Sequence, residues 1–340
     1  MIAIRPFAGS ACEWDAFVAR SPGATYCHLF AWREIMSEAL GHECFHLVAT
    51  DDDGAWRGVL PFVRVRSPLL GHYLVSMPFL NSGGPLGTPE AERELVAWAV
   101  REAQRSKADL LELRSRRMVE SAPRQSNRKI TVHLALPDAP EKLWAAFPSK
   151  LRSQIRRPLK AGFEARFGHD QREPFYEVYA RTMHRLGTPA LPPVLFMQIA
   201  KLMPDITDFG VVYLKDEPAA AGCGFHWNGE FELMWAGALH EHNRDAPNML
   251  LYWSFMERMI AAGAQVFDFG RCTPGGGTHG FKRQWGGRDV PLPWAQWSPS
   301  NVMATPSQDK PIFRFASNCW KQLPHAVTNR VGPLIATRLP

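Results

Sequence analysis

The first 135 residues combine hydrophobic positions of helical period with the two-residue alternation typical of strands. In the longest helical pattern Leu95, Ala99 and Ala103 recur at i, i+4 and i+8, which places them on one face. A polar turn at 51–54, between two apolar runs, indicates a hairpin. In chain order the pattern predicts a strand at 2–4, helices at 12–20 and 29–40, hairpin strands at 45–49 and 58–65, a strand at 74–79, a helix at 90–107 and a strand at 110–114.

The second half repeats this order of elements. Asn228-Gly229 lies between two apolar runs and is a strong hairpin signal. The pattern predicts helices at 143–160, 175–186 and 194–202, strands at 211–214, 220–227 and 231–236, a polar loop at 240–248, a helix at 249–262 and a strand at 266–269. Because hairpin, strand, helix and strand recur, we expect an internal duplication with an α+β fold.

Composition and charge narrow down the cellular compartment and the kinds of binding partner to expect. The chain has 340 residues, 46% of them hydrophobic, which is enough for two globular domains. Its net charge of +6 favours anionic partners such as phosphorylated substrates, tRNA or a membrane surface, but is too low for a dedicated DNA binder. The six cysteines form no C-x-x-C pair, so we expect a cytoplasmic protein with neither disulfides nor a zinc site. We also expect no signal peptide and no transmembrane helix.

The segment 266–287, VFDFGRCTPGGGTHGFKRQWGG, joins a short strand to a glycine-rich loop that carries cations. A strand end followed by such a loop is a common place for a substrate site. Gly275, Gly277 and Gly280 match the spacing of a dinucleotide fingerprint, but no predicted βαβ unit surrounds them. Phe281 stands where a Walker A loop needs Lys, so a phosphate cradle is not specified. The simplest interpretation of the glycines alone is that they let the chain turn.

The order FDFGR, glycine turn and FKRQWG resembles the FemAB family of aminoacyl and acyl transferases. It is most similar to the FemAB-type proteins associated with PEP-CTERM and exosortase systems. The resemblance spans most of the chain and is strongest from Trp144 to Trp285. It implies two tandem GNAT-like domains, each a mainly antiparallel sheet flanked by helices, at 1–138 and 139–300, followed by a tail at 301–340. The tail is either packed on the body or a contact for a membrane or partner.

Three residues of the segment 266–287 are the first candidates for chemistry. Acyl transfer to an amine requires a stabilised tetrahedral intermediate and removal of a proton. The resemblance implies that Lys282 assists the carbonyl and contacts the acceptor, with a buried Phe281 anchoring the loop. Arg271 is a candidate anchor for a phosphate or carboxylate. Asp268 is either a general base or a structural partner of Arg271.

The segment 150–160, KLRSQIRRPLK, carries five basic residues and no acid. Leu151, Ile155 and Leu159 predict a buried stripe at i, i+4 and i+8, and Pro158 predicts an end or a kink. The alternatives for its charges are a solvated face and a phosphate-binding face. The residues proposed for phosphate binding are Arg152, Arg156 and Arg157.

The loop 240–248 lacks the glycine turn with which a GNAT domain holds the pyrophosphate of CoA, and Pro247 has no N–H. We therefore expect no tightly bound cofactor and leave the acyl donor open between aminoacyl-tRNA and acyl-CoA. His240 and His242 lack a third ligand, so no metal site is expected. Further residues expected to line the substrate site are Trp235, Asn248, Tyr252, Phe281 and Trp285, with Asn248 also a candidate helix cap.

The sequence thus favours an N-acyl or aminoacyl transferase acting on an amine of a cell-envelope or exopolysaccharide precursor. A phosphorylated amino sugar or peptide precursor is the expected partner, with tRNA and the inner face of the membrane as further candidates. One alternative is an acyl-CoA-dependent N-acetyltransferase of a small amine. Another is a non-catalytic protein that binds tRNA or a membrane surface through its basic helix.

Overall fold

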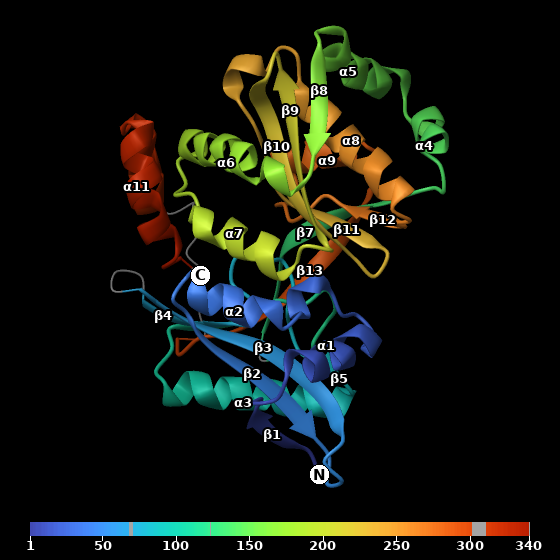
Figure 1. Cartoon of the computed structure of the whole chain (residues 1–340). Helices are drawn as coiled ribbons and strands as arrows, with labels where there is room; N and C mark the ends of the chain where they lie inside the picture. Colours follow the sequence, from blue (N-terminus) through green and yellow to red (C-terminus); the bar gives the residue numbers. More distant parts are fainter. Residues whose placement is uncertain (68–70, 123, 301–310, 340) are drawn as a thin grey trace. The chain divides into compact units, whose positions relative to one another are not determined.

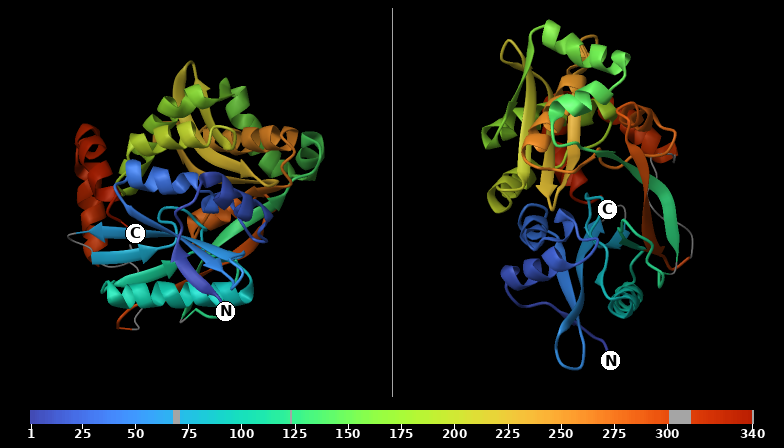
Figure 2. Two further views of the ribbon diagram at one scale, coloured as in Figure 1. Left: turned by 60° about the horizontal axis from the view of Figure 1, so that its bottom comes forward. Right: turned by 90° about the vertical axis from the view of Figure 1, so that its right-hand side faces the viewer.

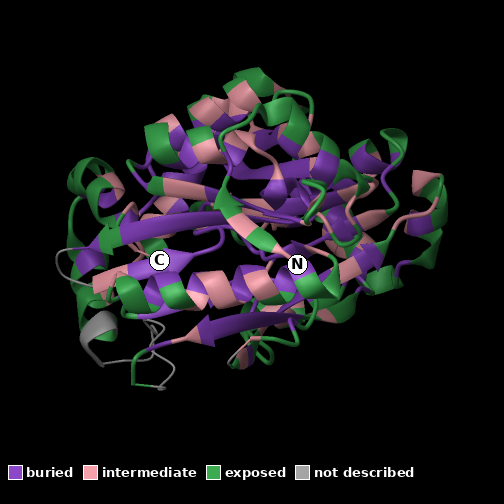
Figure 3. Ribbon diagram, turned by 90° about the horizontal axis from the view of Figure 1, so that it is seen from below, coloured by how far each residue is buried: buried purple, intermediate pink, exposed green. Residues whose placement is uncertain are grey.

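The computed structural model describes residues 1–67, 71–122, 124–300 and 311–339. Backbone contacts divide these residues into two compact units. Unit 1 comprises residues 1–130, 291–300 and 337–339, and unit 2 comprises residues 131–290 and 311–336, both less the gaps given above. Strands are mostly buried and exposed residues gather on the outer faces of helices, as Figure 3 shows.

Unit 1 is a mainly antiparallel sheet with a single parallel pair, β4 with β6. Its helices are α1 (Ala11–Arg20), α2 (Ala31–Glu38) and α3 (Pro89–Arg105). Its strands follow the order β1 (Ala3–Pro6), β2 (Glu43–Thr50), β3 (Trp56–Ser67), β4 (Gly71–Val75), β6 (Leu110–Leu113) and β13 (Arg288–Trp297), with β5 (Leu86–Gly87) beside β3. A 3-10 turn lies at Tyr26–His28.

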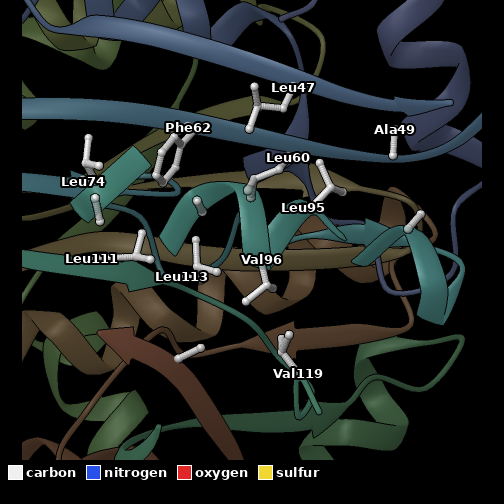
Figure 4. Close-up of a cluster of buried hydrophobic side chains, with 14 of the residues drawn as sticks. Leu47, Ala49, Leu60, Phe62, Leu74, Leu95, Val96, Leu111, Leu113 and Val119 are labelled. Atoms are coloured by element: carbon white, nitrogen blue, oxygen red, sulfur yellow. The ribbon is translucent and has the colours of Figure 1, made fainter. Parts of the chain in front are cut away.

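Helices cover both faces of the unit 1 sheet (Figure 1). Thr88 caps α3 and Pro89 occupies its first turn, so this helix starts where the sequence predicts. The apolar stripe of α3 packs against alternate residues of β2 and β3, and Figure 4 shows Leu95 and Val96 in this core with Leu60. The other face carries α1, whose Trp14 ring lies 4.6 Å from that of His46 on β2.

Unit 2 is a second sheet of the same kind, whose one parallel pair is β11 with β12. Its strand order is β7 (Gln125–Ala135, of which residues 131–135 belong to this unit), β12 (Val266–Asp268), β11 (Glu230–Ala238), β10 (Glu217–Trp227), β9 (Thr207–Leu214) and β8 (Phe163–Phe167). Its helices are α4 (Pro140–Ala146), α5 (Ser149–Lys160), α6 (Arg172–Leu186), α7 (Pro193–Leu202), α8 (Pro247–Ala261), α9 (Gly277–Arg283), α10 (Pro311–Gln322) and α11 (His325–Ala336), with 3-10 turns at His169–Gln171 and His240–His242.

Aromatic contacts define two layers of helices in unit 2 (Figure 2). On one face Phe196 of α7 lies 5.2 Å from the ring of Trp235 on β11. On the other face Phe255 of α8 stacks on Phe231 of the same strand at 5.3 Å. The β10–β11 hairpin turns at Asn228-Gly229, where both residues have positive φ, as a two-residue turn of this composition requires. The strands between the layers are therefore buried on both faces.

The two units share one topology, and this confirms the predicted fold class. In each unit three antiparallel strands, a helix and a parallel strand follow one another: β2–β3–β4–α3–β6 and β9–β10–β11–α8–β12. The next strand along the chain after each series of elements pairs with a strand of the other unit's sheet. β7 follows β6 but pairs with β12, whereas β13 follows β12 but pairs with β6. The last strand of each sheet therefore comes from the other half of the sequence.

Several local predictions need correction. The segment expected as a glycine-broken loop contains a short helix, α9. Helix α5 continues through Pro158 to Lys160, although Pro158 has no N–H to donate to the carbonyl of the preceding turn. Leu159 is 49% exposed and Pro158 is buried, so the buried stripe of α5 consists of Leu151, Ile155 and Pro158. Four strands were not predicted from the sequence: β5, β7, β8 and β13.

The domain bounds 1–138, 139–300 and 301–340 stay a prediction. They differ from the compact units in residues 131–138 and 311–336, which belong to unit 2, and in residues 291–300, which belong to unit 1. Of the expected tail, residues 301–310 lie outside the described residues, and α10 and α11 follow. Among the described residues, no helix combines the length and the apolar character needed to cross a bilayer.

Candidate active site

The candidate site lies in unit 2, where β12 ends beside β7 and β11. Phe267 and Phe269 lie 6.4 and 5.7 Å from the ring of Tyr252 on α8. Because side chains alternate along a strand, Asp268 points to the opposite face. The register places it beside Glu232 of β11 and His133 of β7. Three polar side chains from strands distant in sequence thus meet on one face of the sheet.

Asp268 is held by hydrogen bonds from several sides although it is only 1% exposed. Its Oδ1 accepts from the Gly270 N–H at 2.7 Å and from the Thr131 hydroxyl. Its Oδ2 lies 3.1 Å from Nε2 of His133. A buried carboxylate with this many donors is kept in one orientation, and it fixes the ring of the histidine that it contacts.

Lys282 of α9 closes the same strand end. It is 7% exposed, and its Nζ donates to the carbonyl oxygens of Gly270 at 2.5 Å and Arg271 at 3.0 Å. Burial lowers the pKa of its ammonium group, and the nearby Cys272, Asp268 and Glu232 partly offset this effect. Lys282 is therefore a buried cation that holds the start of the loop after β12, whereas Arg271 is half-buried there.

The aromatic residues expected at the site form the support of α9. Phe281 is half-buried and not buried as expected, and its ring lies 5.0 Å from that of Tyr252. Trp285 is 1% exposed and packs against Phe147 at 5.6 Å. Tyr252 is fully buried among these rings, and this burial raises the pKa of its hydroxyl. By packing against one another, these aromatic residues hold α9, and with it Lys282, in place.

Two other candidates occupy different places in unit 2. Trp235 packs between Phe196 and Phe225 on the face of the sheet to which Asp268 points. Asn248 is half-buried in the first turn of α8 and does not cap it, because the cap position is Ala246 at φ +54°. β11 continues to Ala238 beyond its last pair with β12, Glu232 with Asp268. The two parallel strands thus stop pairing at the candidate site.

The three arginines of α5 contact protein groups away from the hydrogen bonds of Asp268. Arg152 donates weakly to the carbonyls of Trp144 and Ala145, at 3.5 Å each. The Arg156 guanidinium lies 5.1 Å from the centre of the Trp144 ring. Arg157 donates to the carbonyl of Arg244 at 3.2 Å, in the loop that leads into α8. Arg156 and Arg157 remain exposed, as a phosphate-binding or a solvated face requires.

Sequence reasoning missed Thr131, His133 and Glu232. A polar side chain within an apolar strand, as in ITVHLA and FELMW, was the available signal. One set of donors is able to hold a metal ion: His133, Glu230 and Asp268 offer ligand atoms that lie within 4.8 Å of one another. Two of these residues, His133 and Asp268, also form the hydrogen bond described above. The arrangement thus supports either a proton-transfer pair or a cation site.

Residues 149–283 match the family model of the acetyltransferase (GNAT) domain. No curated protein matches the sequence significantly. Several solved structures share the fold. FemX is 14% identical, with a TM-score of 0.64 over 92% of this chain and 100% of that chain. A C-terminal domain assigned to a lysylphosphatidylglycerol synthetase from Agrobacterium fabrum is 12% identical, with a TM-score of 0.57 over 86% and 93%.

A tandem GNAT protein from the clavulanic acid biosynthesis pathway is 12% identical, with a TM-score of 0.55 over 90% of this chain and 100% of that chain. Identities this low show the fold alone. Together with the domain match, they confirm a GNAT-type fold and support an acyltransferase.

Proposed function

We propose that this protein transfers an acyl or aminoacyl group to an amine of a cell-envelope or exopolysaccharide precursor. The observation that carries the proposal is the hydrogen bond between buried Asp268 and half-buried His133 at the end of β12, beside the buried Lys282. It lies in a unit of GNAT-type fold, within or beside the residues that match the domain model. The exopolysaccharide context comes from the resemblance of the segment 266–287 alone.

In this reaction the acceptor nitrogen attacks the acyl carbonyl carbon. A C–N bond forms, the C–O bond of an ester or the C–S bond of a thioester breaks, and the amine loses a proton. With Asp268 accepting from Nε2–H, the other nitrogen of the His133 ring is the basic one. His133 is 14% exposed at its side chain, so a substrate can reach it more easily than Asp268. We assign His133 as the general base and Asp268 as its positioning residue.

Lys282 stabilises the negative charge that develops on the acyl carbonyl oxygen, and Arg271 binds an anionic group of the acceptor. Lys282 holds the carbonyls of Gly270 and Arg271, which fixes the backbone of the loop after β12. A preorganised cation next to the reacting carbonyl stabilises the tetrahedral intermediate without reorganisation. We propose that Lys282 provides this field from its buried position. Arg271 then anchors a phosphate or carboxylate of the acceptor, because its guanidinium suits bidentate contact.

The donor is proposed to be an aminoacyl-tRNA. FemX and the lysylphosphatidylglycerol synthetase domain are among the structures that share the fold. In addition, α8 begins with Pro247, which has no N–H, after a residue in the left-handed conformation. That start offers fewer amides to a pyrophosphate than a glycine turn does. Acyl-CoA is the second candidate donor, because the structure of the tandem GNAT protein with this fold is specified as the form without acetyl-CoA.

The test is a donor and acceptor screen with the purified full chain. Mixed aminoacyl-tRNA and acyl-CoA are each offered with a nucleotide-linked amino sugar and with a short amino-terminal peptide. Mass spectrometry then detects the mass of one added acyl group. The proposal predicts a product with aminoacyl-tRNA. A product with acyl-CoA alone would replace the donor assignment and leave the acyltransferase standing.

His133→Gln is the diagnostic variant, because glutamine keeps a side chain of similar reach but supplies no base. His169→Gln is the matched control, since that histidine lies at the surface and contacts the Pro204 carbonyl. We expect loss of product in the first variant and unchanged product in the second. No product with any donor, while tRNA still binds, would favour a non-catalytic binding protein instead.

A further inference from the structure

Helix α11 places small residues against the body of unit 2. Thr328, Gly332 and Ala336, at i, i+4 and i+8, are its buried positions. A Cβ atom at Gly332 would lie 3.4 Å from the backbone N of Ala190 and 3.4 Å from the ring of Trp320. The helix therefore lies close to the body, and Figure 1 shows it alongside α6.

The larger apolar residues of α11 point toward solvent. They form an apolar stripe at i, i+4, i+7 and i+8, consisting of Val327, Val331, Leu334 and Ile335. Leu334 is 68% exposed, and the other three side chains are 39–43% exposed. A helix that only packs on a protein core turns its large apolar residues inward. The apolar stripe of α11 has the opposite orientation, so it is available to a partner.

The charged residues of the segment that contains the apolar stripe have one sign. Residues 311–340 contain four cationic residues and no Asp or Glu. The four are Arg314, Lys321, Arg330 and Arg338, and all are exposed. On α10, Phe315 is also 70% exposed. Exposed aliphatic side chains on a segment whose own charged residues are all cations are typical of a helix that lies at the surface of an anionic bilayer.

We propose that α11 binds the surface of an anionic membrane, with its apolar stripe inserted between lipid headgroups. The helix has 12 residues, or about 18 Å, which is too short to cross the hydrocarbon core. It therefore lies in the plane of the interface. A second copy of this chain is the less suitable occupant, because a symmetric contact across the apolar stripe would bring Arg330 and Arg338 near their own equivalents. The inference rests on residues outside the candidate active site and holds for either acyl donor.

Vesicle flotation of the full chain tests the proposal. Vesicles of phosphatidylglycerol and phosphatidylcholine are compared with vesicles of phosphatidylcholine alone, at low and high salt. We expect binding only to the anionic vesicles and weaker binding at high salt. The double variant Arg330→Gln with Arg338→Gln should weaken this binding about 30-fold at low salt.

A second variant tests insertion of the apolar stripe. Val331→Glu with Leu334→Glu should abolish flotation, whereas Met197→Glu, at a 45% exposed apolar side chain on α7, should leave it unchanged. Circular dichroism and thermal unfolding should match the wild type, because the altered side chains are at the surface. The proposal is overturned if the wild type fails to float, or if the Val331→Glu, Leu334→Glu protein floats normally. It is also overturned if the only effect of these two substitutions is that light scattering shows a monomer where the wild type is a dimer.

Discussion

Nε2 of His133 lies 3.1 Å from Oδ2 of Asp268, which is 135 positions later in the chain. The two residues meet because β7 and β12 are antiparallel neighbours in register. Their pairing depends on the strand exchange between the two halves, since β7 follows the elements of unit 1 and completes the sheet of unit 2. The candidate site of unit 2 is therefore assembled from both halves of the sequence.

Replacing Lys282 should affect stability as well as turnover. Lys282→Met removes the donor for the Gly270 and Arg271 carbonyls, which are at the end of a buried strand. We expect the free energy of unfolding to fall by about 1–3 kcal/mol, as for other buried groups that lose a partner. Turnover should fall ~100- to 1000-fold, because the loop and the field near the carbonyl both change. Urea unfolding and single-turnover rates measure the two effects.

Lys142→Met is the control for this change, because Lys142 is exposed and pairs with Asp138 at the surface. It should alter neither quantity. Wild-type turnover in folded Lys282→Met protein would remove Lys282 from the reaction and leave it a structural lysine.

Two buried histidines of unit 1 should respond in opposite ways to replacement by phenylalanine. Both ring nitrogens of His46 are buried without a hydrogen-bond partner among the described residues, and the ring packs on Trp14. His28 has partners, namely the Thr25 N–H and the Gly84 carbonyl, each at 3.1 Å. At pH 7.5, His46→Phe should therefore raise the free energy of unfolding by about 1 kcal/mol and His28→Phe should lower it by about 1–3 kcal/mol.

The pH dependence follows from the same burial. Burial lowers the pKa of His46 to about 3 and that of His28 to about 4, from 6.5. Between these values and 6.5 the unfolded chain binds more protons, so the free energy of unfolding falls as the pH falls below 6.5. At pH 5 the gain from His46→Phe should be larger by roughly 2 kcal/mol than at pH 7.5. Urea titrations at both values check this, and a gain independent of pH would contradict the assignment.

The arginines of α5 should contribute to substrate affinity and little to folding. Arg156→Ala with Arg157→Ala should weaken binding of a phosphorylated acceptor and flatten its dependence on salt. Both side chains are exposed, so thermal unfolding should change little. Calorimetry with the acceptor at two salt concentrations measures the effect. The matched pair Lys201→Ala with Lys215→Ala removes the same charge elsewhere in unit 2, and an equal loss of affinity there would indicate net charge alone.

The repeated elements were predictable because each is encoded locally. The Asn228-Gly229 turn, the stripe of α3 and the polar loop before α8 all carry their signal within a few residues. The strands β7 and β13 were missed because each pairs with a strand from the other half of the chain. Their place in a sheet depends on register with distant residues, which periodicity alone does not reveal.

The residues of the candidate site were likewise predictable only where they lie within one local segment of the sequence. Asp268 and Lys282 were found because they lie within one distinctive segment. His133 and Glu232 were missed because each is a single polar residue in an apolar strand, and only the sheet register brings it beside Asp268. Trp285 was expected to line the site, and the structure shows it buried against Phe147.

The most direct test of the account is the rate of acyl transfer by Asp268→Asn. Asparagine preserves the shape of the side chain but no longer favours the His133 tautomer with a proton on Nε2. The measurement is single-turnover transfer to the amine acceptor identified in the screen. The control is Asp208→Asn, because Asp208 is a half-buried carboxylate of β9 that pairs with Arg258 and lies outside the candidate site. The account predicts a loss of about 100- to 10,000-fold in Asp268→Asn protein that remains folded, and no loss in the control. A wild-type rate in folded Asp268→Asn would contradict it.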